Sequence, residues 1–308
     1  PRQGLPMAEL RCAFVTGGDG FVGSHLLRQL LIRGVQVRAL TRRGAAAGRE
    51  DLPVDVEWVT GDLLEPDPWR GRLTGCDALF HVAAFYSPRP EDARQMHAVN
   101  VTGTRNILEA AAAAGVSRVV HTSTIGVVGR PVDGSLPDEN TPFNLWHTGS
   151  EYVRSKWLGE AAALLWASRG LDVVVVQPTA PVGSGDTKPT ATGQRFADFM
   201  AGQRPDYPTG GMNLCPVQDI AVGHILAAEL GQSGQRYILG HHAGNLSEEA
   251  FLALLSDVSG LPVPPAAQRS GGRRPSSLTA DPGRAIEELG LPQSSLHEAF
   301  AAAVATYQ

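Results

Sequence analysis

The chain has 308 residues, of which 43% are hydrophobic and 19% are charged, and its formal net charge is −5. This composition is typical of a globular protein, and its mildly acidic balance gives no reason to expect nucleic acid or an anionic membrane as a partner. The three cysteines stand apart, so we expect neither a zinc site nor a disulfide framework. No apolar run reaches the ~20 residues of a membrane span and no signal-peptide pattern is present, so a cytoplasmic protein is expected.

Short apolar runs alternate with segments of helical spacing through the first 180 residues. Apolar runs bounded by turn residues predict strands, and apolar side chains that recur every three or four residues predict helices. In chain order, we expect strands at 12–16, 35–40, 56–60, 78–83, 118–122 and 171–176, and helices at 26–32, 101–114 and 151–168. This alternation predicts an α/β fold, a doubly wound parallel (Rossmann) sheet with helices on both faces.

The texture of the sequence changes after Pro178, where stretches rich in Gly, Pro and Thr begin. Helical spacing returns at 220–230, 248–259 and 285–289, and an apolar run at 236–239 predicts one more strand. We therefore expect a dinucleotide-binding domain over residues 7–180 and a smaller, discontinuous C-terminal substrate lobe over 181–308. A segment near 212–240 is expected to return to the first domain.

Residues 16–25 have the sequence TGGDGFVGSH, directly after a predicted strand and at the start of a predicted helix. Gly17, Gly20 and Gly23 would allow a tight turn, close approach of a pyrophosphate to the backbone, and close contact between helix and strand. The free N–H groups and the positive dipole end of the helix would then face the phosphates. This context favours a dinucleotide site over a glycine-rich turn without a ligand, although Asp19 is an unexplained acid within the loop.

The end of the second predicted strand favours NADP(H) as the cofactor. An NAD site usually has an acid there to bind the ribose 2′-hydroxyl, whereas this strand ends in Thr41, Arg42 and Arg43, and no acid follows until Glu50. Two guanidinium groups suit a 2′-phosphate, and the alternative is a solvated basic loop, with NAD(H) as the cofactor. Asp62, after the third predicted strand, is placed to accept a hydrogen bond from the adenine amino group.

A tyrosine and a lysine four residues apart supply a candidate catalytic pair. Tyr152 and Lys156 would lie on one face of the helix 151–168, where the ammonium would stabilise phenolate and lower the pKa of Tyr152. Tyr152 would then act as a general acid toward a carbonyl group, and Thr124 or Ser123, after the fifth predicted strand, would hydrogen-bond the same oxygen. The alternative is an ordinary pair on the surface of a helix.

The full set of motifs resembles an extended short-chain dehydrogenase/reductase of the NAD-dependent epimerase/dehydratase superfamily. The motifs are TGGDGFVG at 16–23, GDL at 61–63, HVAA at 81–84, NVTGT at 100–104, HTST at 121–124 and YVRSK at 152–156. Within that superfamily, the chain is most similar to the dihydroflavonol-4-reductase-like branch, which includes bacterial proteins called hopanoid-associated sugar epimerases. The segments 185–193 and 237–240 carry the likeness to the bacterial group.

The resemblance implies a role for each residue that matches a family motif. Tyr152 would be the acid/base, and Lys156 would bind the nicotinamide ribose and depress the Tyr152 pKa. Thr124 would polarise the carbonyl, with Ser123 as the fallback, and Asn100 would position the loops after the fourth and fifth strands. The expected chemistry is hydride transfer between nicotinamide C4 and a carbonyl or carbinol carbon, with a small carbonyl compound or alcohol as the substrate.

The resemblance also implies the cofactor contacts. The backbone N–H groups of Phe21 and Val22 would meet the pyrophosphate. Val82, Ala83 and Ala84 would line the adenosine side, Pro178 and Val182 the nicotinamide side, and Leu63 and Thr122 would add further contacts. No metal is expected, because the histidines show no metal-ligand spacing. The helices 101–114 and 151–168 build a dimer interface in many relatives, so they would permit a homodimer.

Two candidate functions would use the same cofactor site, so the residues of the smaller lobe must distinguish between them. Nucleotide-sugar members of the superfamily usually carry an Asn where this chain has Gln177 and a diphosphate-binding Arg where it has Met212, although Arg273 and Arg274 could compensate. The expected pocket is mostly apolar or aromatic, which suits a lipophilic ketone or aldehyde. Its residues are Phe85, Tyr86, Trp146, Thr187, Gln194, Phe196 and Met212.

We therefore predict an NADP(H)-dependent carbonyl reductase or alcohol dehydrogenase, with a nucleotide-sugar epimerase or dehydratase as the alternative. A third hypothesis is a non-catalytic redox-sensing or scaffold protein on the same fold. Relatives of that kind typically lose the tyrosine or the lysine, whereas Tyr152 and Lys156 are both present here.

Overall fold

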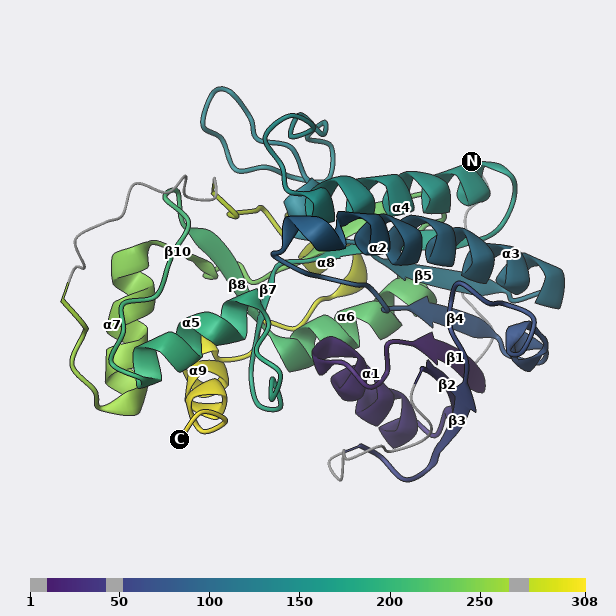
Figure 1. The fold of residues 1–308 in the computed structure, drawn as a ribbon, viewed down its shortest axis with the longest axis horizontal. Helices are drawn as coiled ribbons and strands as arrows, with labels where there is room; N and C mark the ends of the chain where they lie inside the picture. Colours follow the sequence, from purple (N-terminus) through teal and green to yellow (C-terminus); the bar gives the residue numbers. More distant parts are fainter. Residues whose placement is uncertain (1–9, 43–51, 266–276) are drawn as a thin grey trace.

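Seven parallel strands form the main sheet, in the order β3-β2-β1-β4-β5-β6-β9 (Figure 1). The computed structural model describes residues 10–42, 52–265 and 277–308, so Arg43, Glu50, Arg273 and Arg274 lie outside the described residues. The strands are β1 (Cys12–Thr16), β2 (Gln36–Thr41), β3 (Val56–Thr60), β4 (Ala78–His81), β5 (Arg118–Thr122), β6 (Val173–Pro178) and β9 (Arg236–Leu239). The chain runs outward from β1 to β3 and continues on the other side of β1 at β4, which confirms the predicted doubly wound α/β fold.

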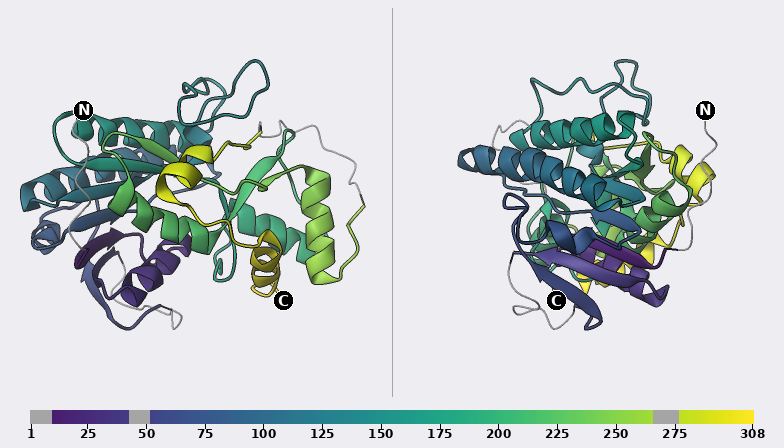
Figure 2. Two further views of the ribbon diagram at one scale, coloured as in Figure 1. Left: turned by 180° about the vertical axis from the view of Figure 1, so that it is seen from behind. Right: turned by 90° about the vertical axis from the view of Figure 1, so that its right-hand side faces the viewer.

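Helices cover both faces of this sheet (Figure 2). Alternate side chains of each strand point to opposite faces, and in β1 both sets are buried. Val15 packs in one core with Leu27, and Phe14 packs in a second core with Ile107. The helices on the first face are α1 (Phe21–Ile32), α6 (Val217–Leu230) and α8 (Gly283–Leu289), and those on the second face are α2 (Ala93–His97), α3 (Thr104–Ala114) and α4 (Glu151–Ser168).

Of the three helices predicted in the first part of the chain, α4 has the predicted bounds, whereas the other two differ at their N-terminal ends. The helix expected at 26–32 begins at Phe21, directly after the glycine loop. The helix expected at 101–114 is α3, and it ends as predicted at Gly115, whose φ of 70° favours glycine. A π-helical segment, η3 (Ala98–Gly103), joins α2 to α3, and η1 (Arg70–Leu73), η2 (Pro90–Asp92) and η4 (Ile125–Val127) are short 3-10 helices.

A smaller lobe lies on one side of the main sheet, at the left of Figure 1. Its three short strands have the order β10-β8-β7, and three helices pack around the rings of Phe196, Phe251 and Phe300, whose centroids lie 5.1–5.6 Å apart. The elements are β7 (Ala180–Val182), α5 (Ala191–Met200), β8 (Met212–Pro216), β10 (Asn245–Leu246), α7 (Glu248–Ser259) and α9 (Leu296–Val304). We predicted α7 from its spacing but missed the other five elements.

The chain crosses between the two parts more than once. After β8 it returns through α6 to β9, which pairs with β6 at the edge of the main sheet. The predicted boundary at residue 180 falls where β6 ends and β7 begins. Among the helices of the described residues, none is both long enough and apolar enough to cross a membrane.

Candidate active site

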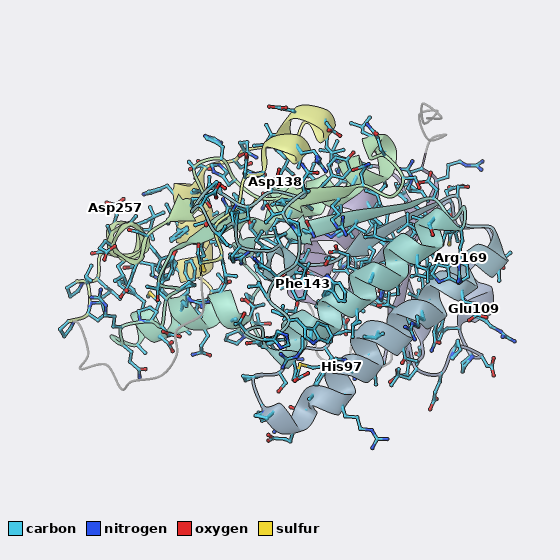
Figure 3. All side chains as sticks on the ribbon, turned by 90° about the horizontal axis from the view of Figure 1, so that it is seen from above. His97, Glu109, Asp138, Phe143, Arg169 and Asp257 are labelled. Atoms are coloured by element: carbon cyan, nitrogen blue, oxygen red, sulfur yellow. The ribbon has the colours of Figure 1, made fainter. Side chains whose placement is uncertain are left out.

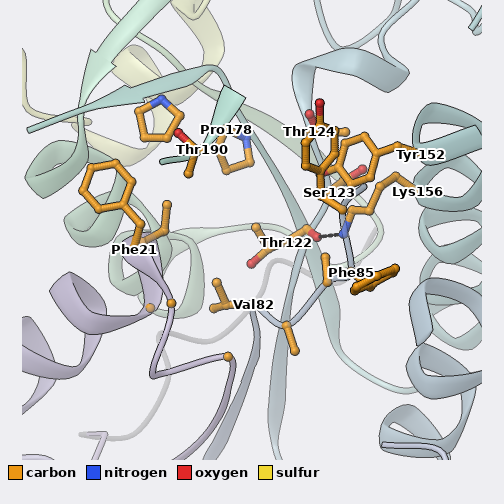
Figure 4. Close-up of a pocket in the computed structure, with 18 of the residues that line it drawn as sticks. Phe21, Val82, Phe85, Thr122, Ser123, Thr124, Tyr152, Lys156, Pro178 and Thr190 are labelled. Atoms are coloured by element: carbon orange, nitrogen blue, oxygen red, sulfur yellow. Dashed lines mark hydrogen bonds between the residues drawn. The ribbon is translucent and has the colours of Figure 1, made fainter. Parts of the chain in front are cut away.

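A cavity of about 590 Å³ opens at the carboxyl ends of the main-sheet strands, where the strand order reverses (Figure 4). Opposite crossovers on the two sides of a reversal leave a crevice at that edge of an α/β sheet. The wall of the cavity includes the glycine loop, the end of β2, the loop after β4, the start of α4 and the segment after β6. The smaller lobe closes the remaining side with residues of α5, β8 and the strand-like segment at Leu278.

The glycine loop has space for hydrogen atoms only at two of its three predicted positions. Gly17 has a φ of 72°, and a Cβ added to it would lie 2.7 Å from the backbone nitrogen of Ala83. A Cβ on Gly23 would collide with the carbonyl oxygen of Gly17. No side chain caps α1 at Gly20, so the N–H groups of the first turn remain available at the cavity wall. This cradle fits the pyrophosphate of a dinucleotide.

Asp19, which the sequence left unexplained, lies beside the end of β2. The hydroxyl of Thr41 donates a hydrogen bond to its carboxylate, with an oxygen–oxygen distance of 3.4 Å. The carboxylate therefore helps to join the glycine loop to the second strand. Thr41 and Arg42, which we predicted at the ribose end, both line the cavity, and Arg43 lies outside the described residues.

The predicted adenosine side also lies in the cavity wall, which includes Leu63, Val82, Ala83 and Ala84. Asp62 lines the cavity too, but one of its carboxylate oxygens accepts a hydrogen bond of 2.9 Å from the backbone N–H of Leu64. That bond closes a turn and leaves the second oxygen for a ligand.

Tyr152 and Lys156 lie one helical turn apart near the start of α4, and both line the cavity. The hydroxyl of Ser150 caps this helix by accepting a hydrogen bond from the Val153 N–H. The ammonium of Lys156 donates to the carbonyl oxygen of Thr122 at 2.6 Å (Figure 4). Lys156 is buried, whereas Tyr152 is partly exposed in the cavity wall.

Thr124 joins this pair from the end of β5. Its hydroxyl oxygen accepts a hydrogen bond of 3.2 Å from the Gly126 N–H, and the Thr124 hydroxyl lies close enough to the Tyr152 phenol to lower the pKa of Tyr152. Ser123 also lines the cavity, but its hydroxyl is buried and has no hydrogen-bond partner among the described residues. Thr124 is therefore better placed than Ser123 to share a ligand oxygen with Tyr152.

The pKa values of the pair differ from our expectation. We expected Lys156 to lower the pKa of Tyr152, but burial and then the neighbouring Tyr86 raise the pKa of Tyr152 to about 12. Burial lowers the pKa of Lys156 to about 8, although the Glu160 carboxylate opposes this shift. Burial is the largest cause of both shifts, because loss of water favours the neutral form of each group.

Asn100 lies behind the cavity wall rather than in it, and it is only 2% exposed. Its amide donates to the carbonyl oxygen of Phe85 and to the hydroxyl of Ser155, both at 2.9 Å, and its own oxygen accepts from the Phe85 N–H at 2.8 Å. Asn100 thus holds the segment after β4 against the catalytic face of α4. This geometry is consistent with the positioning role that the resemblance implies.

Two buried histidines lie under the site on adjacent strands. His81 of β4 bonds to the hydroxyls of Thr16 and Thr104, at 2.8 and 2.9 Å, and its ring centroid lies 5.4 Å from that of His121 of β5. Neither ring nitrogen of His121 has a hydrogen-bond partner among the described residues. Burial, and then the Lys156 charge, lower the pKa of His81 to about 3 and hold the pKa of His121 well below its usual value.

Several predicted pocket residues do line the cavity. Phe85, Tyr86, Met212, Thr122 and Pro178 are among them, and the Tyr86 ring meets the Tyr152 ring edge to face at 5.1 Å.

Five other predicted residues do not line the cavity. Trp146 packs beside Trp157 at the start of α4, where the labelled Phe143 also lies (Figure 3). Thr187 and Gln194 are exposed, whereas Val182 and Phe196 are buried in the core of the smaller lobe. Of these five residues, Trp146 and Thr187 lie in irregular segments, where spacing does not fix the direction of a side chain.

Sequence reasoning missed part of the wall on the side of the smaller lobe. Thr190 and Thr192 at the start of α5, Arg195 one turn later, and Leu278 all line the cavity. A threonine followed by helical spacing is an N-cap signal, and the Thr190 hydroxyl does accept a hydrogen bond from the Gly193 N–H. No comparable signal in the sequence marks Arg195. The described residues contain no group of three His, Cys, Asp or Glu side chains that could hold a metal.

The Rossmann sheet, the glycine loop and the Tyr–Lys helix together define an extended short-chain dehydrogenase/reductase. Over residues 13–240 the sequence matches the NAD dependent epimerase/dehydratase family, and the chain belongs to that family.

Named relatives and solved structures of several activities resemble this chain. It is 40% identical to a Synechocystis sp. protein named "Putative dihydroflavonol 4-reductase", over 96% of this chain and 94% of that one. It is 34% identical to sterol demethylase protein B of Methylococcus capsulatus, over 96% of this chain and 97% of that one. The dTDP-glucose 4,6-dehydratase of Streptomyces venezuelae, solved with NAD bound, has a TM-score of 0.80 at 29% identity, over 96% of each chain.

The buried His121 should make the protein less stable in acid. A histidine whose pKa is lowered by folding takes up a proton more readily in the unfolded chain. Protonation therefore favours the unfolded chain, and the free energy of unfolding decreases as the pH falls below about 6.5. We expect His121→Leu to lose less free energy of unfolding than the parent between pH 7 and pH 5. The free energy of unfolding is measured by urea unfolding at each pH. Its slope against pH should differ between the two proteins by up to about 1.4 kcal/mol per pH unit.

The substitution removes no hydrogen bond of the described residues, because both ring nitrogens of His121 lack partners there. His147→Leu, at an exposed position, is the control and should keep the parental slope. An identical slope in His121→Leu and the parent would contradict the prediction.

Proposed function

We propose that this protein is an NADP(H)-dependent oxidoreductase that reduces a ketone or aldehyde, or oxidises the corresponding alcohol. One observation carries the proposal: Tyr152, Thr124 and Lys156 line the same cavity as the glycine loop. The family is NAD(P)-dependent, and the cradle at Gly17 and Gly23 has the shape that a dinucleotide requires.

The cofactor, when bound, supplies a hydride to the carbonyl carbon. Tyr152 and Thr124 would hold the carbonyl oxygen between their hydroxyl groups. A pKa of about 12 keeps Tyr152 protonated at neutral pH, so it has a proton to give as negative charge develops on that oxygen. Lys156, with a pKa of about 8, is charged at neutral pH and would stabilise the phenolate that remains.

A nucleotide-sugar epimerase or dehydratase is the second candidate, because the fold is shared with a dTDP-glucose dehydratase. Two positions argue against it. Gln177 is buried and hydrogen-bonded to Glu160 at 3.0 Å, and it does not line the cavity. Met212 lines the cavity without a charge. Neither residue offers the polar contacts that a diphosphate requires.

A substrate panel tests the proposed function. NADPH absorbance is followed with aryl ketones, aldehydes, flavanonols and nucleotide sugars, and we expect turnover of ketones or aldehydes. Turnover of nucleotide sugars alone, with cofactor retained through purification, would replace the reductase by the epimerase.

Tyr152→Phe should lower kcat for the best carbonyl substrate by ~10² or more, because the general acid is lost. The dissociation constant of NADPH should change little, since the ring and Lys156 remain in place. Tyr237→Phe removes the hydroxyl of a buried tyrosine in β9, away from the cavity, and should retain parental kcat. A Tyr152→Phe enzyme with unchanged kcat would remove Tyr152 from its proposed role.

Arg42 supports the preference for NADP(H). Arg42→Ala should raise the KM for NADPH by on the order of 10-fold and leave the KM for NADH nearly unchanged, because only NADPH carries the 2′-phosphate. Arg33→Ala, at an exposed position outside the cavity wall, is the charge-matched control. Equal effects on both cofactors, or tighter binding of NADH by the parent, would contradict this assignment.

A further inference from the structure

Arg195 is a cation of the cavity wall that the proposed chemistry does not use. Among the described residues, the cavity-lining cations are Arg42, Lys156 and Arg195. Arg42 lies at the end of β2 and Lys156 beside Tyr152, where each has a proposed role with the cofactor. Arg195 instead comes from α5 in the smaller lobe, on the substrate side.

The guanidinium of Arg195 is held by backbone oxygens on two of its three nitrogens. Nε donates to the carbonyl oxygen of Asp206 at 2.7 Å, and Nη1 donates to the carbonyl oxygen of Ala191, one turn earlier in α5. The remaining nitrogen, Nη2, makes no hydrogen bond with the described residues, and it is not fully buried. Two bonds thus fix the plane of the group and leave one nitrogen for a ligand.

The positive charge of Arg195 is not neutralised by direct contact. No carboxylate among the described residues lies within ion-pair distance of the guanidinium. Burial lowers its pKa from the usual value, and the more distant Asp206 is the first of the charges that oppose this shift. Asp198, a further opposing charge, accepts a hydrogen bond from the Gln194 side chain at 2.7 Å. A partly exposed cation in the cavity wall, without an ion-pair partner among the described residues, is suited to bind an anion.

The surroundings of Arg195 place this anion at one end of a substrate. Tyr86 lies close enough to Arg195 to influence its pKa, and the same Tyr86 ring contacts Tyr152 at 5.1 Å. Arg195 lies in the cavity wall on α5 of the smaller lobe, whereas Tyr152 lies in the wall near the start of α4. A substrate held by both would have its carbonyl at Tyr152 and its anionic group on the side of the smaller lobe.

We propose that Arg195 is a specificity-determining residue that selects carbonyl substrates carrying a carboxylate at the end remote from the reacting carbon. This inference rests on the proposed reductase function. One free nitrogen and a single positive charge match a carboxylate better than a diphosphate, which requires more donors. The rest of this side of the pocket, with Ala180, Pro181, Met212 and Leu278, is apolar and suits the carbon skeleton.

The test compares keto acids with their methyl esters, which have the same carbon skeleton and no charge. The parent enzyme with saturating NADPH should turn over the acid with a kcat/KM on the order of 10- to 100-fold above that of the ester. Arg195→Gln should raise the KM of the acid by a similar factor and change kcat/KM of the ester by less than about threefold. Arg195→Lys should recover part of the preference, because it retains the charge without the planar donors.

Arg169→Gln removes an exposed arginine at the end of α4 and should keep the parental preference (Figure 3). The thermal midpoint and the NADPH dissociation constant of each variant are measured alongside, so that an unfolded variant is recognised. The parental ratio of acid to ester does not depend on any variant and tests the proposal by itself.

Three outcomes would overturn the assignment. The first is equal kcat/KM of the parent for acid and ester. The second is an equal loss of kcat/KM for acid and ester in Arg195→Gln. The third is inhibition of the parent by UDP that is stronger than inhibition by the hydroxy acid product and is lost in Arg195→Gln. Turnover of neutral ketones without preference for the acid would overturn only the role of Arg195. Absence of turnover with acids, esters and neutral ketones alike would overturn the reductase function itself.

Discussion

A chain of buried hydrogen bonds joins the glycine loop to the catalytic helix, and its direction is fixed. The Thr104 hydroxyl donates its single proton to the carbonyl oxygen of Asn100, so it must accept from Nε2 of His81. Nδ1 of His81 is then unprotonated and accepts from the hydroxyl of Thr16, at the end of β1. Asn100 carries the connection to Ser155 on α4. The low pKa of His81 agrees with this single neutral tautomer.

This series of hydrogen bonds explains why the glycine loop and the catalytic pair keep a defined position relative to each other. Thr16 immediately precedes Gly17, and its hydroxyl also accepts from the Ala83 N–H, which lies beside the cradle. Ser155 immediately precedes Lys156 and donates to the carbonyl oxygen of Tyr152. Loss of any member would leave a buried polar group without its partner, which costs ~1–3 kcal/mol. The constraint is therefore energetic as well as geometric.

The parts of the site that lie on regular elements could be predicted from the sequence. The period of apolar residues determines which strands are buried and which face of α4 carries Tyr152 and Lys156, so these positions follow from pattern alone. The positions of Trp146, Thr187 and Gln194 could not be predicted, because they depend on how loops and the short α5 pack against the smaller lobe. Arg195 was missed for the same reason, since its place in the wall depends on the orientation of α5.

The pKa of Tyr152 shows a different limit of sequence reasoning. Spacing predicts that Lys156 lies one helical turn from Tyr152, but the pKa of the phenol depends on how much water the phenol loses, which no spacing reveals. In the folded chain burial has the largest effect on the pKa of Tyr152, which therefore retains its proton more firmly than a free tyrosine.

The raised pKa keeps Tyr152 protonated at neutral pH, which is the state that the proposed reduction requires of its general acid. Specificity would be set separately from this chemistry. The proposed cofactor contacts and the catalytic pair come from the main sheet and its helices, whereas Arg195, Met212 and Leu278 come from later segments that pack on the other side of the cavity. Changes in those segments could alter the substrate without disturbing the hydrogen-bond chain from Thr16 to Ser155.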